Sequence, residues 1–372
     1  MIDHCINLCV NFNVCCGKIK VMIKLKFAFQ NLFLIFCVGL MLSVAGCAPA
    51  VPIVDQPTEE PLVDTPVSPV LEVTTPSPIP EALPTVLLIT GTEVDPFMVS
   101  QSEDMLEKLA EEASMQFAKL EGLEPEMLTP EVKVVVGVGQ DLDLNTLAVN
   151  YPGIAFVAIG SATASVADNV SVIGNPAVET RQKAFMAGYL SAITSSDNKI
   201  AALIAEENPA RDLLAESYEV GARFFCGICH QVFPPYGTFP QWEAVSTSTL
   251  ANDFRAIIDQ YSNIAVEIMY VDGDLASPEL FAYLEEVGIK VVSDRSPDLP
   301  RSNWIGTIAV DPAPALEAIW PDLIAAGAGK QVPALIVLTD RHSGLLSAGR
   351  YRLFEAMTTD LQSGMVSIEI TP

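Results

Sequence analysis

From residue 85 onward, short apolar runs alternate with stretches in which apolar residues recur every three or four positions. Short runs rich in Val, Ile and Leu indicate strands that are buried on both faces, and the longer spacing indicates amphipathic helices. The runs predict strands at 86–90, 132–138, 154–159, 170–173, 200–205, 266–271, 290–292, 305–310 and 334–338. The spacing predicts helices at 103–120, 144–150, 179–194, 210–225, 250–261, 278–287 and 313–326.

This regular alternation predicts an α/β fold built from parallel sheets with helices on both faces. The region 85–372 is long enough for two doubly wound parallel-sheet lobes joined by a hinge. We expect lobe 1 at about 85–196 plus about 301–333, and lobe 2 at about 197–300 plus the C-terminal segment. An eight-stranded barrel is the alternative. The irregular spacing and the Pro-rich, aromatic insert at 231–242 make it less favourable.

The N-terminal region has a different pattern. Lys24 and Lys26 precede an apolar run, and the run ends in Val-Ala-Gly followed by Cys47. A charged start, an apolar centre and small residues at the end are typical of a secretory signal peptide. The ending resembles the bacterial lipobox, which implies that Cys47 is lipidated and that 1–46 is a leader that is removed. A transmembrane anchor is the alternative, since the run approaches the length that spans a bilayer.

The next segment, 47–84, is predicted to be a disordered tether. Residues 48–84 hold ten of the 27 prolines, six acidic residues, and no Gly, Lys or Arg. Such a composition cannot bury a core and favours extended conformations. At about 3.1 Å per residue, a fully extended segment reaches on the order of 100 Å.

The charge excludes one class of function. The chain has 20 basic and 46 acidic residues, a net charge of −26, and loss of 1–46, with its four Lys and one Asp, takes this to −29. Binding to nucleic acid depends on Lys and Arg that neutralise phosphates. We therefore expect no nucleic-acid partner.

Cys226 and Cys229 are the two cysteines that follow the predicted anchor. In an exported domain a local disulfide between them is the favoured interpretation. Together with His230 they also match the C-x-x-C-H pattern of haem attachment, which stays an alternative, as does a free or metal-bound state. Zinc needs further ligands beyond this group. We therefore expect no metal and no cofactor.

Several stretches resemble the basic membrane protein family, the lipid-anchored substrate-binding proteins of ABC importers. The residues that carry the resemblance are VKVVVGVGQDLDLNTLAVNYPGIAFVAIG (132–160), NVSVI (169–173), AFMAGYLSA (184–192), KIAALI (199–204) and YEVGA (218–222). The resemblance covers roughly 130–300 well. It implies a type I periplasmic-binding-protein fold, an ABC permease as partner, and a small polar ligand, with purine nucleosides as the ligands of several members.

The fold also indicates where a ligand binds, because open α/β sheets bind ligands beyond the carboxyl ends of their strands. Acidic and amide side chains there can bond sugar hydroxyls, and aromatic rings can stack on a planar ring. Turn formation alone also places such residues at strand ends. The candidates are Asp95, Phe97, Gly139, Gln140, Ser161, Glu206, Asn208, Tyr236, Trp242, Asp272, Asp274, Asp294 and Arg295.

Together these patterns predict an extracytoplasmic, lipid-anchored receptor without enzymatic activity. It is expected to bind a small polar solute between two lobes and to present it to a membrane permease. The alternatives are a ligand-sensing domain for a membrane signalling partner and a haem-carrying redox lipoprotein.

Overall fold

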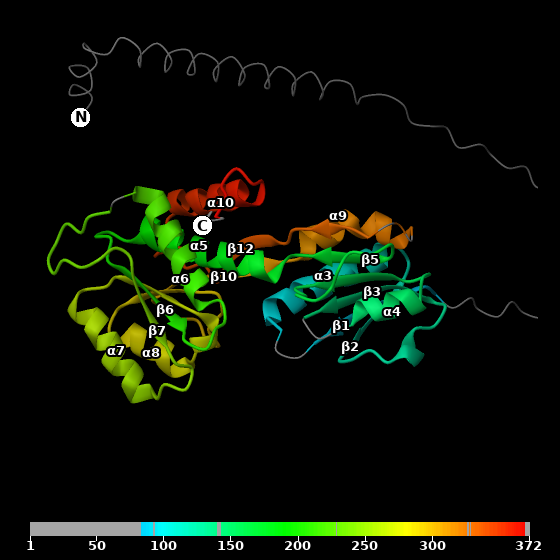
Figure 1. Cartoon of the computed structure of the whole chain (residues 1–372), viewed down its shortest axis with the longest axis horizontal. Coiled ribbons are helices and arrows are strands. Elements are labelled where there is room, and N and C mark those ends of the chain that lie inside the picture. The colour runs from blue at the N-terminus through cyan, green and yellow to red at the C-terminus, as the bar shows by residue number, and fades with distance from the viewer. Residues whose placement is uncertain are drawn as a thin grey trace, which may run out of the picture. The chain divides into compact units, whose positions relative to one another are not determined.

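The computed structural model describes residues 83–91, 94–139, 143–227, 229–325, 327 and 329–368. They form two six-stranded sheets (Figure 1). All strand pairs of the first sheet are parallel. Its strand order is β11 (Gln331–Val332), β5 (Val170–Ile173), β4 (Ala155–Ile159), β3 (Val132–Val138), β1 (Thr85–Thr90) and β2 (Gln116–Leu120).

The second sheet has one antiparallel pair, β10 with β12, and is otherwise parallel. Every residue of its strands β6 and β8 is buried, as a strand covered on both faces requires. The strand order is β12 (Leu335–Thr339), β10 (Trp304–Asp311), β9 (Lys290–Ser293), β8 (Ile268–Val271), β6 (Ile200–Ala205) and β7 (Gln241–Val245).

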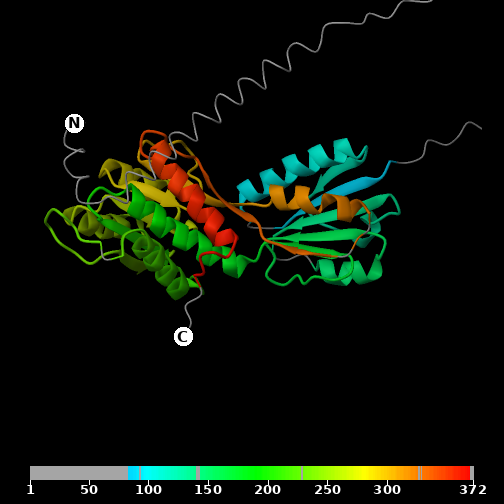
Figure 2. The ribbon, with the colours of Figure 1, turned by 90° about the horizontal axis from the view of Figure 1, so that it is seen from above.

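Helices cover these sheets. Figures 1 and 2 show α9 beside α3 at the first sheet, and α5, α6 and α10 beside one another at the second. The helices are α3 (Pro96–Glu112), α4 (Leu144–Asn150), α5 (Pro176–Thr194), α6 (Arg211–Cys226), α7 (Ala251–Asn263), α8 (Pro278–Glu286), α9 (Ala313–Ile324) and α10 (Ala348–Gln362).

Three of these helices begin with the same local signal, a polar capping residue followed by proline. Asp95 caps α3, Asn175 caps α5, and Ser277 caps α8, and each side chain accepts a hydrogen bond from a backbone N–H of the first turn. Proline suits the next position because its fixed φ is helical and its missing N–H would have no partner there.

The predicted fold class is confirmed: the protein is an α/β protein with two doubly wound, mostly parallel lobes. The barrel alternative is wrong, because the described strands form two separate sheets. The polypeptide passes between the sheets after β5, after β10 and again after β11.

The predicted lobe boundaries need correction. The helix α5, which we assigned to lobe 1, packs on α6, α10 and several strands of the second sheet, so lobe 2 begins near residue 175 rather than 197. The strand β10 pairs with β9 and β12. The polypeptide therefore returns to lobe 1 after Asp311, and not at residue 301. Both errors have one cause: an apolar run shows that an element is buried, but not against which sheet.

The predicted helix at 103–120 is also wrong beyond Glu112. The helix α3 ends at Glu112, Ser114 adopts a φ of 55°, and residues 116–120 form the edge strand β2. The sequence analysis also missed β7 and α10. The strand β7 is a half-exposed edge strand. Its polar residues interrupt the sequence, so it lacks the continuous apolar run by which the central strands were identified.

The leader 1–46, Cys47 and the tether up to residue 82 lie outside the described residues. Within the described part of the chain, none of the helices combines the length and the apolar character that a membrane span needs.

Candidate functional site

Polar side chains gather at the carboxyl ends of β6, β8 and β9, three neighbouring strands of the second sheet. Asn208 follows β6, Asp272 and Asp274 follow β8, and Asp294 follows β9. We call these four residues the strand-end cluster. The Nδ2 of Asn208 lies 3.5 Å from Oδ2 of Asp272 and 3.3 Å from Oδ2 of Asp274, so one amide links two carboxylates. The sequence prediction placed all four at the site, and the structure brings them together.

Asp272 is the most buried member of the cluster, with 4 % of its surface exposed. Its Oδ2 accepts a hydrogen bond of 3.1 Å from the N–H of Ala205, and its Oδ1 accepts one of 3.2 Å from the N–H of Asp274. Burial, and then the negative charge of Asp294, raise the pKa of Asp272 to about 6. The cluster therefore gains a proton in mildly acidic solution.

Asp294 lies beside Asp272 and is partnered by Lys183 of α5. The Nζ of Lys183 donates to Oδ2 of Asp294 at 2.9 Å, and Oδ1 of Asp294 accepts from the N–H of Gly273 at 2.7 Å. Burial, the largest single effect, would raise the pKa of Asp294, but the charge of Lys183 and the hydrogen bonds from Lys183 and Gly273 together hold that pKa below its usual value. Asp294 is therefore a charged acceptor within a mostly buried ion pair.

A carboxylate from outside the second sheet also affects the pKa of Lys183. Burial lowers the pKa of Lys183, but Asp294, Asp95 and Glu179 together hold it above its usual value. Asp95 caps α3, directly after the first-sheet strand β1, whereas Asp294 belongs to the second sheet. Lys183 thus links the charges of the strand-end cluster to the first sheet.

The first-sheet candidates have local structural roles. The Oδ1 of Asp95 accepts the N–H of half-buried Phe97 at 2.9 Å. Ser161, which is 6 % exposed, accepts the N–H of Ala164 at 3.1 Å. Gly139 has a φ of 115°, and a Cβ there would lie 2.7 Å from the Val94 side chain, so only glycine fits this turn.

Other candidates lie apart from the cluster. Tyr236 precedes β7, and Trp242 is the second residue of that strand and donates from Nε1 to Oε1 of Glu219 at 3.1 Å. Because β7 runs parallel to β6, the start of β7 lies at the amino ends of the strands, whereas the strand-end cluster lies at their carboxyl ends. Tyr236 and Trp242 therefore lie on the opposite side of the sheet from the cluster. The prediction that these rings stack on a ligand at the cluster is therefore not supported by their position.

Glu206 and Arg295 are exposed residues that follow β6 and β9. The Nη1 of Arg295 lies 3.4 Å from the carbonyl oxygen of Gly273, at the rim of the cluster. Gln140 lies outside the described residues.

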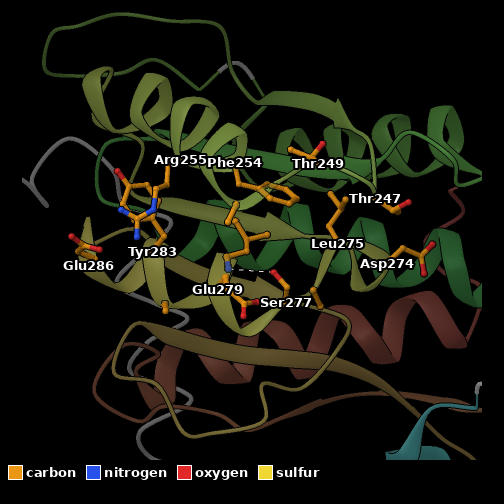
Figure 3. Close-up of a pocket in the computed structure, with 14 residues that line it drawn as sticks. Thr247, Thr249, Phe254, Arg255, Asp274, Leu275, Ser277, Glu279, Tyr283 and Glu286 are labelled. Carbon is orange, nitrogen blue, oxygen red and sulfur yellow. Dashed lines mark hydrogen bonds between the residues drawn. The ribbon is translucent and has the colours of Figure 1, made fainter.

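A pocket of about 480 Å³ opens beside Asp274 (Figure 3). Its walls come from α7, α8 and the loops that follow β7 and β8. Figure 3 shows Asp274 and Thr247 at one end, and Arg255 and Tyr283 at the other, where the guanidinium lies 4.4 Å from the ring centre. Asp274 therefore faces an open space in the second lobe.

The sequence analysis missed Lys183 and Glu179. They are four residues apart on α5, where side chains share one helix face. Glu179 is 6 % exposed, and its Oε1 accepts the N–H of Asn175 at 3.0 Å. The signal that could have found Lys183 is its place next to the apolar run that starts at Ala184, where a lysine needs a buried partner.

The carboxylates of the cluster are oxygen ligands of the kind that hard metal ions bind, but they are not arranged as a metal site. No group of three or more His, Cys, Asp or Glu side chains in the described ranges is arranged to hold a metal ion. The cluster instead presents carboxylate oxygens, with the ammonium of Lys183 beside Asp294, and this suits a polar organic molecule that donates several hydrogen bonds.

The raised pKa of Asp272 leads to a prediction about stability. Between its unfolded pKa of about 4 and its folded pKa of about 6, the folded state holds a proton that the unfolded state lacks, so stability rises as the pH falls. Relative to Asp272→Asn, the wild type should gain about 1 kcal/mol of unfolding free energy between about pH 7 and 5. Urea unfolding at the two pH values measures this. Asp274→Asn, a change at an exposed neighbour, should keep most of the wild-type pH dependence, because Asp274 contributes least to the raised pKa of Asp272.

The comparisons with known proteins support the fold. Neither the protein-family models nor the curated proteins give a match. Among solved structures, a solute-binding protein of an ABC transporter system from Conexibacter woesei has a TM-score of 0.58 at 17% identity, covering 77% of this chain and 98% of its own. A transcriptional activator of the comK gene from Bacillus halodurans has a TM-score of 0.54 at 13% identity, covering 77% and 100%. AraP, an arabinose-binding protein from Geobacillus stearothermophilus, has a TM-score of 0.50 at 12% identity, covering 70% and 97%. At these identities the likeness establishes a two-lobed fold of the periplasmic-binding type.

Proposed function

We propose that this protein is an extracytoplasmic solute-binding lipoprotein of an ABC importer. It binds a small polar solute between its lobes and delivers it to a membrane permease. Affinity comes from closure of the lobes around the solute, a hinge motion, and not from a chemical reaction.

The observation that carries this proposal is the position of the strand-end cluster. It lies at the carboxyl ends of parallel strands, where α/β proteins of this architecture hold their ligands. The electrostatic link from Asp294 through Lys183 to Asp95 supports a site to which both lobes contribute. The similar fold of the solute-binding protein from C. woesei supports the same role.

The ligand class follows from the acceptors. Asp272, Asp274 and Asp294 offer carboxylate oxygens to a solute rich in hydroxyl or amino groups. A purine nucleoside has both kinds of donor, and it is the ligand that the resemblance to the basic membrane protein family implies. We therefore propose a purine nucleoside as the first ligand to test.

A thermal-shift panel on the mature protein tests this function. We expect a purine nucleoside at about ten times its Kd to stabilise the fold by about 1.4 kcal/mol. Bases, sugars and amino acids complete the panel. Asp274→Asn should reduce the shift without lowering the melting temperature of the unliganded protein. A response to sugars or amino acids alone would contradict the nucleoside ligand, and no response to any solute would contradict the transport function.

A ligand-sensing role is the second candidate. The fold similarity to the transcriptional activator from B. halodurans favours it, because that protein is named for regulation rather than transport. Purification of the membrane-bound protein with its partner separates the two roles. A permease is expected for transport, and a histidine kinase for sensing.

We further propose that Cys47 carries the lipid anchor and that Cys226 and Cys229 form a disulfide. The Cα atoms of these two cysteines lie 5.5 Å apart, within the range that a disulfide needs. A disulfide leaves neither thiol free to bind haem. A haem absorption band in the purified protein would overturn this assignment.

A further inference from the structure

The segment 224–242, which we call the aromatic loop, differs from the rest of the chain. Its 19 residues contain six of the 27 aromatic residues and no Asp, Glu, Lys or Arg, although 18% of the whole chain is charged. The segment joins the end of α6 to the start of β7, and Figure 2 shows it extending beyond α6. The proposed solute site does not account for this composition, since the strand-end cluster lies at the carboxyl ends of the parallel strands and the aromatic loop leads into the amino end of β7.

Apolar side chains of this loop are exposed to solvent. The exposed fraction is 62% for Val232, 64% for Phe233 and 72% for Tyr236, and Phe224 and Phe225 at the end of α6 are about half exposed. A group of exposed aromatic side chains in one segment marks an interaction surface rather than ordinary surface variation.

Side chains of the lobe core and its surface form hydrogen bonds to the backbone of the loop. The N–H groups of Val232 and Phe233 both donate to the carboxylate of Asp197, which is 5% exposed and forms an ion pair of 2.8 Å with buried Lys199. The side-chain amide of Asn198 donates to the carbonyl oxygen of His230 at 2.9 Å. This bracing fixes the backbone while the apolar side chains point outward.

The same bracing lowers the cost of removing the loop from water. The N–H of Gly237 donates to Oε1 of Gln231 at 2.6 Å, and the prolines at 234, 235 and 240 have no backbone N–H. Three backbone N–H groups of the loop are therefore bonded and three positions have none, so these six positions add no unpaired donor when the loop enters an apolar region. A surface built in this way suits the boundary of a lipid bilayer, where aromatic rings are favoured and charged groups are not.

We propose that the aromatic loop inserts into the interfacial region of the membrane to which the protein is tethered. This inference relies on the proposed lipid anchor at Cys47. The residues between Cys47 and Leu83 reach on the order of 100 Å when extended, which is ample for the domain to touch the bilayer. The contact is apolar, because the strong net negative charge rules out attraction to anionic lipids.

A tryptophan reporter in the lipidated full protein, reconstituted in phosphatidylcholine vesicles, tests the proposal. Val232→Trp places the reporter in the aromatic loop. Val149→Trp is the matched control, since Val149 is also an exposed valine, 81% exposed on α4 of the first lobe. With nitroxide-labelled lipids, the emission of Val232→Trp should decrease more strongly than that of Val149→Trp and shift to shorter wavelength.

Adding Phe233→Ser and Tyr236→Ser to the reporter should abolish this quenching without changing the melting temperature, because both side chains are exposed. Equal quenching at positions 232 and 149 overturns the proposal. So does a concentration-dependent dimer that the two serine substitutions abolish, because the loop would then bind a second copy. Flotation of the vesicles with wild type and with Cys47→Ser tests the anchor separately, and the solute panel tests transport independently of both.

Discussion

Gly188→Ala should lower the free energy of unfolding by about 2–3 kcal/mol, because it places a methyl group where two helices touch. Gly188 lies on α5, and a Cβ there would be 2.0 Å from the carbonyl oxygen of Tyr218 on α6. Gly221 on α6 makes the reciprocal contact, since its Cβ would lie 1.9 Å from the carbonyl oxygen of Phe185. The backbones of the two helices must therefore separate to accommodate any side chain, and this disturbs a buried core.

The matched control for this change is Gly349→Ala on the exposed face of α10. A Cβ at that position meets nothing closer than the far end of Arg352, at 4.0 Å. Alanine is favoured over glycine within a helix by about 1 kcal/mol, so this variant should be slightly more stable than the wild type. Urea unfolding of both variants measures the difference. A Gly188→Ala variant as stable as wild type would show that α5 and α6 are not packed this closely.

Lys183→Met should lower the free energy of unfolding by about 3 kcal/mol at neutral pH, because it leaves Asp294 charged, mostly buried and unpaired. The side chains of Lys183 and Asp294 are 23% and 15% exposed, so water compensates little for the lost partner. Without Lys183, burial raises the pKa of Asp294. The deficit should therefore shrink as the pH falls and Asp294 takes up a proton.

Lys108→Met is the corresponding control at the surface. Lys108 pairs with Glu317 at the same distance of 2.9 Å, but both side chains are at least half exposed. Exposed pairs contribute little, so stability should hardly change. Denaturation of both variants at neutral and mildly acidic pH separates the two cases. An equal effect of the two substitutions, or a Lys183→Met deficit that does not depend on pH, would contradict the role of the buried pair.

The helix α5, which both predictions concern, is also important for the proposed function. Lys183 and Gly188 lie on α5, which follows the first-sheet strand β5 and packs on the second sheet. The same helix therefore brings a charge to the strand-end cluster and fixes that cluster to the core of lobe 2. If the solute panel confirms binding, Lys183→Met should separate these roles, since it changes the charge at the site and leaves the helix contact at Gly188 intact.

The candidate site was partly predictable. The strand-end cluster could be identified because each member follows an apolar run within three residues, and parallel strands have their carboxyl ends on one side of the sheet. Lys183 could not be identified in this way, because it lies within a helix and reaches Asp294 from 111 residues away. Tyr236 and Trp242 were assigned from their chemistry alone, and the direction of β7 places them on the opposite side of the sheet from the cluster.

The amino-acid sequence alone determined the class of fold, because an apolar run of strand length followed by helical periodicity is a local property. It also determined the candidates at strand ends and the unusual composition of the aromatic loop. Only the tertiary structure decided that α5 and β10 belong to the second sheet, that residues 116–120 pair as an edge strand, and that Lys183 partners Asp294. These features depend on contacts between distant residues, and the hydrophobic pattern, which records burial but not the partner, cannot specify them.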